Sequence, residues 1–178
     1  MRKFFYVLVL YNSMSVSVEP IKVVKPVNYK MVDLTLSRSG QIEMQNVPWL
    51  KVNGFTDVIN LRTMRNPAID FDEGKTLEAS GIKYHNIPSV SRSPRVENVN
   101  KFLKTVEDIK SAGGKVLVHC KQGADRTGMY VYIYESLNEI GTTFSRVLEM
   151  FRHGYHYRTY PHLIKWANDF VKHYKGLI

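Results

Sequence analysis

Residues 116–128 of this chain read VLVHCKQGADRTG, and they decide its fold. The first four predict a buried strand that ends at Cys120, the only cysteine among the 178 residues. Five residues separate Cys120 from Arg126, and a largely apolar helical pattern follows from Thr127. In this order of strand, short loop and helix, the backbone N–H groups of the loop and the positive end of the helix can surround one anion.

The loop residues have the properties that phosphoryl transfer requires. Gly123 permits backbone angles or close approaches that a side chain would exclude, and Arg126 can bind two phosphate oxygens at once. The same N–H groups favour a thiolate, so we expect Cys120 to be ionised and able to attack phosphorus, forming a phosphocysteine that water hydrolyses. An inert buried thiol is the alternative for a lone cysteine, but it does not explain the arginine and glycines at this spacing.

The segment from His119 to Gly128 resembles the signature of cysteine-dependent phosphatases, the protein tyrosine phosphatase superfamily. The short chain suggests the compact, dual-specificity-like branch, whose bacterial members have segments similar to 37–41 (SRSGQ), 58–62 (VINLR) and 82–88 (IKYHNIP). The resemblance spans about residues 36–171. It extends to the tyrosine-phosphatase-like phytases, a group of inositol phosphatases in the same superfamily. It implies a phosphatase that needs neither a metal nor another cofactor.

The resemblance also assigns roles to individual residues. It implies that Cys120 and Arg126 are catalytic, that Thr127 donates a hydrogen bond to the cysteine sulfur, and that His119 supports the loop. The residues expected to bind substrate are Lys121, Gln122, Gly123, Ala124, His119 and Arg62.

The general acid departs from the usual family pattern. Family members supply it from an aspartate well before the cysteine, but no aspartate lies between His85 and Lys104, and Glu97 fits the first turn of a helix. Some bacterial and lipid-directed members also have an aspartate at the position of Asp125 and lack the usual one. We therefore predict that Asp125 protonates the leaving group and then activates water. Asp125 could instead pair with a nearby arginine or cap the helix. Two further aspartates are more distant candidates, Asp70 and Asp72.

The patterns of the remaining chain indicate an α/β fold with a central, largely parallel sheet flanked by helices. The predicted strands are 56–61, 83–87 and 115–119, with 28–36 as an edge strand. Helices are expected from Ser93-Pro94 to about residue 113, over 127–138 and 143–152, and from Pro161 onward. The helix over 127–138 is apolar on most sides, as a central helix should be. In the helix over 143–152 four residues should face inward, namely Phe144, Val147, Leu148 and Phe151.

The N-terminus has the pattern of a secretory signal. Arg2 and Lys3 precede the apolar run 4–11, and small residues follow at 15–17. We therefore expect residues 1–17 to be a signal peptide, 18–27 a leader and 28–178 a single phosphatase domain, with the protein secreted or periplasmic. The apolar run is too short to span a bilayer, and an N-terminal strand in a cytoplasmic protein is the alternative.

The charge of +9 favours an anionic phosphorylated substrate, either an inositol polyphosphate or a phosphoprotein. Removal of residues 1–17 deletes only two basic residues, giving 9 − 2 = +7, although scattered basic residues are also typical of a solvated surface. Lys121 directly follows the nucleophile, as in phosphatases that act on inositol phosphates. Four arginines could line the rim or simply face solvent, namely Arg62, Arg92, Arg95 and Arg158. The cluster Tyr155–Arg158 is expected to pack around the last helix.

Four functions stay open at this point. An inositol polyphosphate (phytate-like) phosphatase leads, and a protein tyrosine or dual-specificity phosphatase is the alternative. An RNA 5′-phosphatase shares the chemistry, but residues 121–123 lack the basic, His-containing loop of that group, which argues against nucleic acid. A pseudophosphatase that binds phosphate without turnover is favoured only by the missing upstream aspartate.

Overall fold

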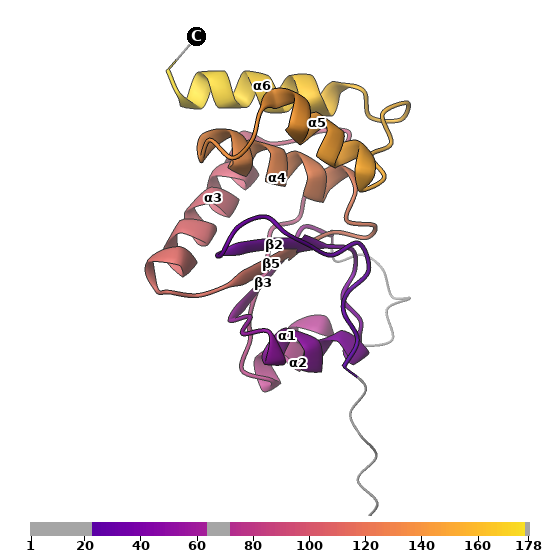
Figure 1. The fold of residues 1–178 in the computed structure, drawn as a ribbon, viewed down its shortest axis with the longest axis vertical. Helices are drawn as coiled ribbons and strands as arrows, with labels where there is room; N and C mark the ends of the chain where they lie inside the picture. Colours follow the sequence, from indigo (N-terminus) through magenta and orange to yellow (C-terminus); the bar gives the residue numbers. More distant parts are fainter. Residues whose placement is uncertain (1–22, 64–71, 177–178) are drawn as a thin grey trace, which may run out of the picture.

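The computed structural model describes residues 23–63 and 72–176 and contains one sheet between two layers of helices (Figure 1). The predicted signal peptide, the first half of the leader (18–22) and Asp70 lie outside the described residues. The strands are β1 (Lys30–Met31), β2 (Leu36–Ser39), β3 (Asp57–Asn60), β4 (Lys83–Asn86) and β5 (Val116–His119). Their order is β1-β2-β5-β3-β4, and only the β1–β2 pair is antiparallel. The predicted α/β fold is confirmed.

The helices divide between the two faces of the sheet, as Figure 1 shows. One face is covered by the 3-10 helix η1 (Met44–Asn46), α1 (Val47–Val52) and α2 (Glu73–Ala79). The other is covered by α3 (Val96–Ser111), α4 (Asp125–Leu137), α5 (Thr143–Arg152) and α6 (His162–Tyr174). Every residue of α4 from Thr127 to Ser136 is buried, which confirms the prediction of a central helix.

The predicted edge strand over 28–36 is confirmed only in part, since β1 (Lys30–Met31) lies at the edge of the sheet but the rest of the segment does not continue it. The segment forms two strands joined by a turn, in which the Asp33 carboxylate accepts hydrogen bonds from the backbone N–H groups of Thr35 and Leu36 at 2.8 and 2.7 Å. An aspartate that bonds the backbone a few residues ahead stabilises a turn rather than continuous extended chain. As a result β2 lies inside the sheet, between β1 and β5, and its carboxyl end adjoins the loop that begins at Cys120.

Two helix starts differ from the prediction by two residues. The helix expected from Ser93-Pro94 begins at Val96, because the Ser93 N–H closes a turn on the Val90 carbonyl at 3.1 Å and Arg95 is still extended. The helix expected from Thr127 begins at Asp125. Glu97 lies in the first turn of α3, as predicted.

The inward face of α5 is only partly the predicted one, since Val147 packs against the core and Leu148 is half-buried. Phe144 and Phe151 are exposed, with 76% and 46% of their surface accessible, whereas Glu149 and Met150 are buried. Glu149 pairs with a buried arginine of β2, and this pairing requires the carboxylate to face the sheet. The helix is therefore turned so that part of its apolar stripe faces solvent.

A cluster of charged groups lies between the sheet and the helices α4 and α5. Arg38 of β2 is fully buried; its Nη1 donates to Glu149 Oε2 at 2.6 Å, and its Nη2 donates to the backbone oxygen of Gly123. Lys30 Nζ lies 3.3 Å from Glu149 Oε1 and 3.9 Å from Glu135 Oε1. The cluster connects two strands and two helices to the loop that follows β5.

Within residues 23–63 and 72–176, none of the helices has both the length and the apolar character needed to cross a bilayer.

The orientation of α5 predicts opposite outcomes for two alanine substitutions on it. Met150→Ala should destabilise the protein by about 2–5 kcal/mol, because the side chain is fully buried. Phe144→Ala should change the free energy of unfolding by no more than about 0.5 kcal/mol, because the ring is exposed. Urea denaturation of both variants measures the difference, and a larger loss from Phe144→Ala would contradict this orientation.

The buried carboxyl of Glu135 predicts a pH-dependent stability. Burial, and then the charge of Glu149, raise the pKa of Glu135 from 4.5 to about 7. Between these values the folded chain binds more protons than the unfolded chain, so the stabilising contribution is complete below pH 4.5 and is lost as the pH rises through 7.

Glu135→Gln should therefore be more stable relative to the wild type at pH 8 than at pH 5, because the amide keeps the shape and does not ionise. Urea denaturation at both pH values measures this shift, with Glu97→Gln on the exposed first turn of α3 as the matched control. An identical difference at both pH values would contradict the assignment.

Candidate active site

The chain from Cys120 to Ala124 forms a loop at the carboxyl end of β5, between β2 and β3, and α4 begins directly after it. Cys120 is a free thiol with 3% of its surface exposed. In open parallel sheets ligands bind beyond the carboxyl ends of the strands. The structure therefore places the predicted nucleophile at the position where such a sheet binds its ligand.

Gly123 holds the loop against the end of β2. Its φ is +73°, and a Cβ atom there would lie 2.5 Å from the backbone oxygen of Ser39 and 2.6 Å from the backbone nitrogen of Gly40. Both the left-handed backbone and the close approach exclude a side chain. Next to this contact the Gln41 N–H donates to the Lys121 carbonyl at 3.0 Å. The SRSGQ segment (37–41) therefore packs directly against the loop.

Glu73 is a site residue that the sequence analysis missed. Its Oε1 lies 2.7 Å from His119 Nε2, and both side chains are buried. His119 Nδ1 donates to the backbone oxygen of Cys120 at 3.2 Å. His119 therefore connects the carboxylate of α2 with the first residue of the loop. The acidic residues Asp72 and Glu73 could have indicated the start of a helix. The pairing of Glu73 with His119, 46 positions later in the sequence, could not be predicted from any local pattern.

Arg62 lies beside the loop through Gln41. The Gln41 side chain donates to Glu73 Oε2 at 2.6 Å and accepts a hydrogen bond from Arg62 Nη1. The backbone N–H of Arg62 donates to Asn60 Oδ1 at 2.7 Å, which anchors it to the end of β3. The half-buried guanidinium is therefore held at the same edge of the sheet as Cys120.

Arg126 and Thr127 lie in the first turn of α4. Arg126 Nη1 is 3.3 Å from the carbonyl of Leu61 and 3.4 Å from that of Ser89, and the guanidinium is half-buried. These two long bonds use one nitrogen, so the rest of the guanidinium can contact an anion. Thr127 Oγ1 is fully buried and has no hydrogen-bond partner among the described residues. The predicted bond from Thr127 to the Cys120 sulfur is not formed here.

Asp125 pairs with a histidine, which the sequence analysis did not foresee. Asp125 is 9% exposed, and its Oδ1 accepts a hydrogen bond from the backbone N–H of His156 at 2.8 Å. The Nδ1 of the same histidine lies 3.0 Å from Oδ2. Neither of the two alternatives, an arginine partner or a helix cap, is observed, since the N-cap position is Ala124 and has no side-chain cap bond.

Asp72, one of the more distant candidate acids, has a structural partner. Asp72 caps α2 by accepting a hydrogen bond from the Lys75 N–H at 3.2 Å, and this bond is the main cause that lowers the pKa of Asp72.

The predicted packing role of residues 155–158 holds only for Tyr155, which is buried and donates to the Tyr160 carbonyl. The following residues 156–158 are exposed.

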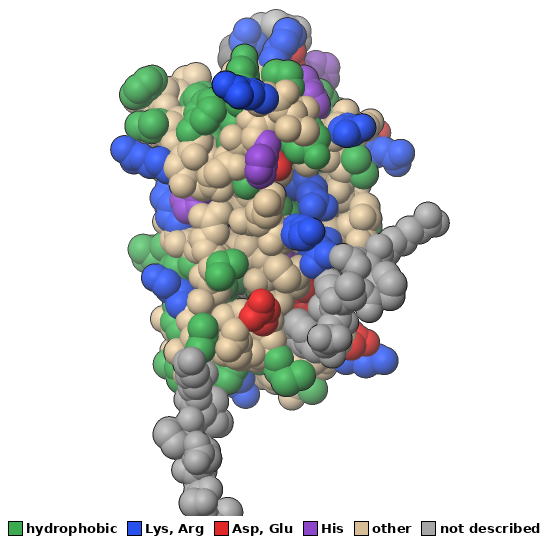
Figure 2. All heavy atoms as spheres, turned by 90° about the vertical axis from the view of Figure 1, so that its right-hand side faces the viewer, with side chains coloured by type: hydrophobic (Ala, Val, Ile, Leu, Met, Phe, Trp, Pro, Cys, Tyr) green, Lys and Arg blue, Asp and Glu red, His purple; other side chains and the backbone are tan. Residues whose placement is uncertain are grey.

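Basic side chains gather on the face where the parallel strands end. Figure 2 views the molecule from this side and shows a group of Lys and Arg side chains near its middle. Arg62 and Arg126 are half-buried at the loop, and four further basic residues are exposed, namely Lys121, Arg92, Arg95 and Arg158. The charge of this face suits an anionic ligand.

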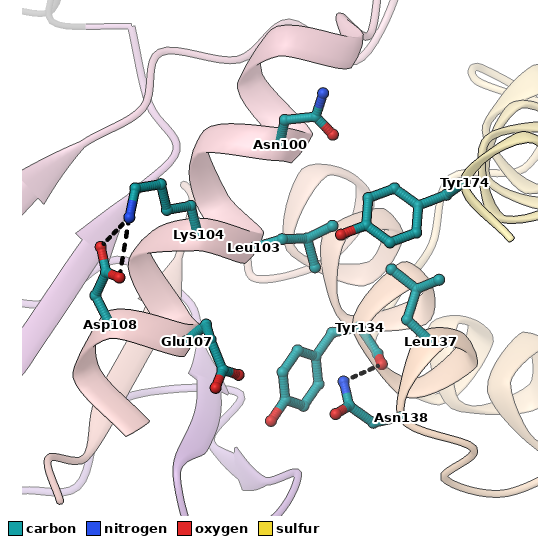
Figure 3. A pocket seen from close by; sticks show the side chains of 9 residues that line it. All are labelled: Asn100, Leu103, Lys104, Glu107, Asp108, Tyr134, Leu137, Asn138 and Tyr174. Atoms are coloured by element: carbon teal, nitrogen blue, oxygen red, sulfur yellow. Dashed lines mark hydrogen bonds and ion pairs between the residues drawn. The ribbon is translucent and has the colours of Figure 1, made fainter. Parts of the chain in front are cut away.

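Two hollows elsewhere on the surface do not include the loop. One, of about 540 Å³, lies between α3, α4 and α6, where Lys104 pairs with Asp108 at 2.9 Å (Figure 3). The other, of about 590 Å³, includes Asp57, Lys83 and His85, which lie in β3 and β4. None of the residues that line them belongs to 119–127.

Comparisons with known proteins agree with this geometry. The chain is 32% identical over 113 residues to inositol diphosphatase DSP1 of Oryza sativa subsp. japonica, a match that covers 61% of this chain and 49% of that protein. The chain thus spans about half the length of this curated relative. A DUF442 protein from Shewanella putrefaciens CN-32 has 26% identity and a TM-score of 0.71, covering 82% of this chain and 89% of that one.

A further structure shares the fold. It is the core catalytic domain of the PP-IP phosphatase SIW14 from S. cerevisiae, with 21% identity and a TM-score of 0.65, covering 75% of this chain and 80% of that one. The family model described as "DSP-PTPase phosphatase fused to NAD+ Kinase" matches residues 14–154. The chain therefore belongs to this family of dual-specificity and tyrosine phosphatases.

Proposed function

We propose that the protein hydrolyses phosphate monoesters through a phosphocysteine formed on Cys120. The observation that carries this proposal is the shape of the loop, which begins at Cys120 after β5, is pressed through Gly123 against the end of β2, and leads directly into α4. Backbone N–H groups held in this way meet the charge on the equatorial oxygens of the transition state. Family membership, which rests on residues 14–154, supports the same chemistry.

The roles of the other site residues follow from their positions. Arg126 binds the phosphate oxygens with the part of its guanidinium that the carbonyls of Leu61 and Ser89 leave available. Residues 121–124 supply the backbone N–H groups. Thr127 donates its unpaired buried hydroxyl to the sulfur when the phosphocysteine is hydrolysed, since an unsatisfied buried hydroxyl gains free energy by acquiring a partner. Asp125 transfers the proton in both steps.

We propose an inositol polyphosphate as the substrate, including those that carry a diphosphate group. The similarity to inositol diphosphatase DSP1 supports this class. So do the basic side chains around the loop, because each phosphate on a crowded ring needs its own counter-charge. Export of the protein, as the pattern of residues 1–17 favours, belongs to the same proposal and can be tested by fractionation of the cells.

Cys120→Ser should abolish turnover and keep phosphate binding. Serine fits the same space, but its hydroxyl is not ionised at neutral pH and cannot replace the thiolate as nucleophile. Turnover is measured with 4-nitrophenyl phosphate, and binding by titration calorimetry with inorganic phosphate. Turnover that survives in this variant would remove the nucleophile assignment, and a wild type that binds phosphate without turnover would be a pseudophosphatase.

A substrate panel should rank the inositol polyphosphates first. We expect kcat/KM for inositol hexakisphosphate or a diphosphorylated inositol to exceed that for a phosphotyrosine peptide at least about tenfold, or 1.4 kcal/mol of transition-state binding. Lys121→Ala should reduce this preference, whereas Lys110→Ala in the last turn of α3 should not. A higher kcat/KM for the peptide would identify a protein phosphatase, and one for triphosphorylated RNA would identify an RNA phosphatase.

A further inference from the structure

One residue, His156, supplies both nitrogen atoms that contact the Asp125 carboxyl. Its backbone N–H donates to Oδ1 at 2.8 Å, and its ring Nδ1 lies 3.2 Å from Oδ1 and 3.0 Å from Oδ2. His156 belongs to the connection between α5 and α6, 31 residues after Asp125 in the sequence. The carboxyl is therefore held by a part of the chain that is separate from the phosphate loop.

This contact distinguishes the two oxygens of Asp125. A backbone N–H can only donate, so Oδ1 accepts. Because the carbonyl oxygen of a neutral carboxyl is a better acceptor than its hydroxyl oxygen, this bond favours Oδ2 as the oxygen that carries the proton. The torsion that turns an aspartate carboxyl is broad and has a roughly two-fold profile, so a free carboxyl would exchange its oxygens. Proton transfer needs one oxygen within hydrogen-bond reach of the reacting atom. His156 restricts the carboxyl to one such arrangement.

We propose that His156 is a positioning residue that directs Oδ2 of Asp125 toward the reacting phosphate ester, an inference that rests on the proposed function. In the first step the Cys120 sulfur bonds to phosphorus, the bond from phosphorus to the leaving oxygen breaks, and that oxygen takes the proton from Oδ2. In the second step a water oxygen bonds to phosphorus and gives a proton to Oδ2. The electrons of the sulfur–phosphorus bond then return to Cys120.

A role for His156 in packing alone fits the structure less well. Tyr155 already anchors this connection, since it is buried, its N–H donates to the Met150 carbonyl at 3.1 Å, and its hydroxyl donates to the Tyr160 carbonyl. The His156 side chain is 46% exposed, and within the described chain its ring has hydrogen bonds only to Asp125. Its carbonyl serves the turn, since it accepts hydrogen bonds from the N–H groups of Thr159 and Tyr160 at 3.0 and 2.9 Å. An exposed ring whose single target is a nearly buried carboxyl is placed to orient that carboxyl.

The test compares two esters that differ in their need for a proton. The leaving group of phenyl phosphate needs protonation, whereas that of 4-nitrophenyl phosphate needs little. For His156→Ala we expect kcat/KM to fall about tenfold on phenyl phosphate and no more than about twofold on 4-nitrophenyl phosphate. His156→Asn should restore most of the loss, because its amide N–H can replace Nδ1 as the donor. His173→Ala, on the exposed end of α6, is the matched control.

A double substitution separates orientation from packing. In Asp125→Asn the loss of His156 should have no further effect on phenyl phosphate, since the group that it orients no longer transfers a proton. Equal losses of His156→Ala on both esters, or full additivity with Asp125→Asn, would overturn the inference while Cys120-dependent activity upheld the proposed function. If the wild type hydrolysed neither these esters nor the inositol phosphates, the proposed function would fail and the inference with it.

Discussion

The close contact between Gly123 and the backbone of Ser39 and Gly40 is the constraint on which the site depends. Contacts of 2.5 and 2.6 Å for a Cβ leave no room for any side chain at residue 123. Because of this contact the loop after β5 bends against β2, and Arg38 Nη2 can reach the Gly123 carbonyl. The turned carbonyl leaves the neighbouring N–H groups free to face the opposite side, where the proposed function places the anion.

Burying Arg38 and Glu149 next to the loop costs free energy, and Arg38 also donates a hydrogen bond to the Gly123 carbonyl. Removing a guanidinium and a carboxylate from water is unfavourable, and the pairing of Arg38 with Glu149 offsets this only through good geometry and additional hydrogen bonds. Arg38 Nε has no partner among the described residues, so the compensation is incomplete. Apolar residues of similar volume could stabilise the fold as well, but they could not bond the Gly123 carbonyl. The ion pair is therefore explained by loop geometry rather than by stability.

Local sequence patterns predicted those strands whose limits depend on residues close together in the sequence. The predicted strands over 56–61, 83–87 and 115–119 agree within one residue with β3, β4 and β5, because apolar runs and turn residues define them. The partners of Glu73, Glu149 and His156 lie 46, 111 and 31 positions away, and no periodicity records such pairs. The error on α5 has the same origin, since the stripe that includes Phe144 predicted its inward face, whereas the pairing of Glu149 with β2 decided it.

The place of Asp125 changes how an acid and a nucleophile can be aligned. An acid on a separate loop must approach the ester after binding, whereas Asp125 lies in the first turn of α4, directly after the loop that begins at Cys120. With Asp125 as the proposed acid, the short loop limits the separation of the two groups, and the rotation of the carboxyl decides how they are aligned. The connection between α5 and α6 restricts that rotation through His156. In the proposed mechanism, proton transfer therefore depends on how the C-terminal helices pack against α4, well outside the segment that carries the nucleophile.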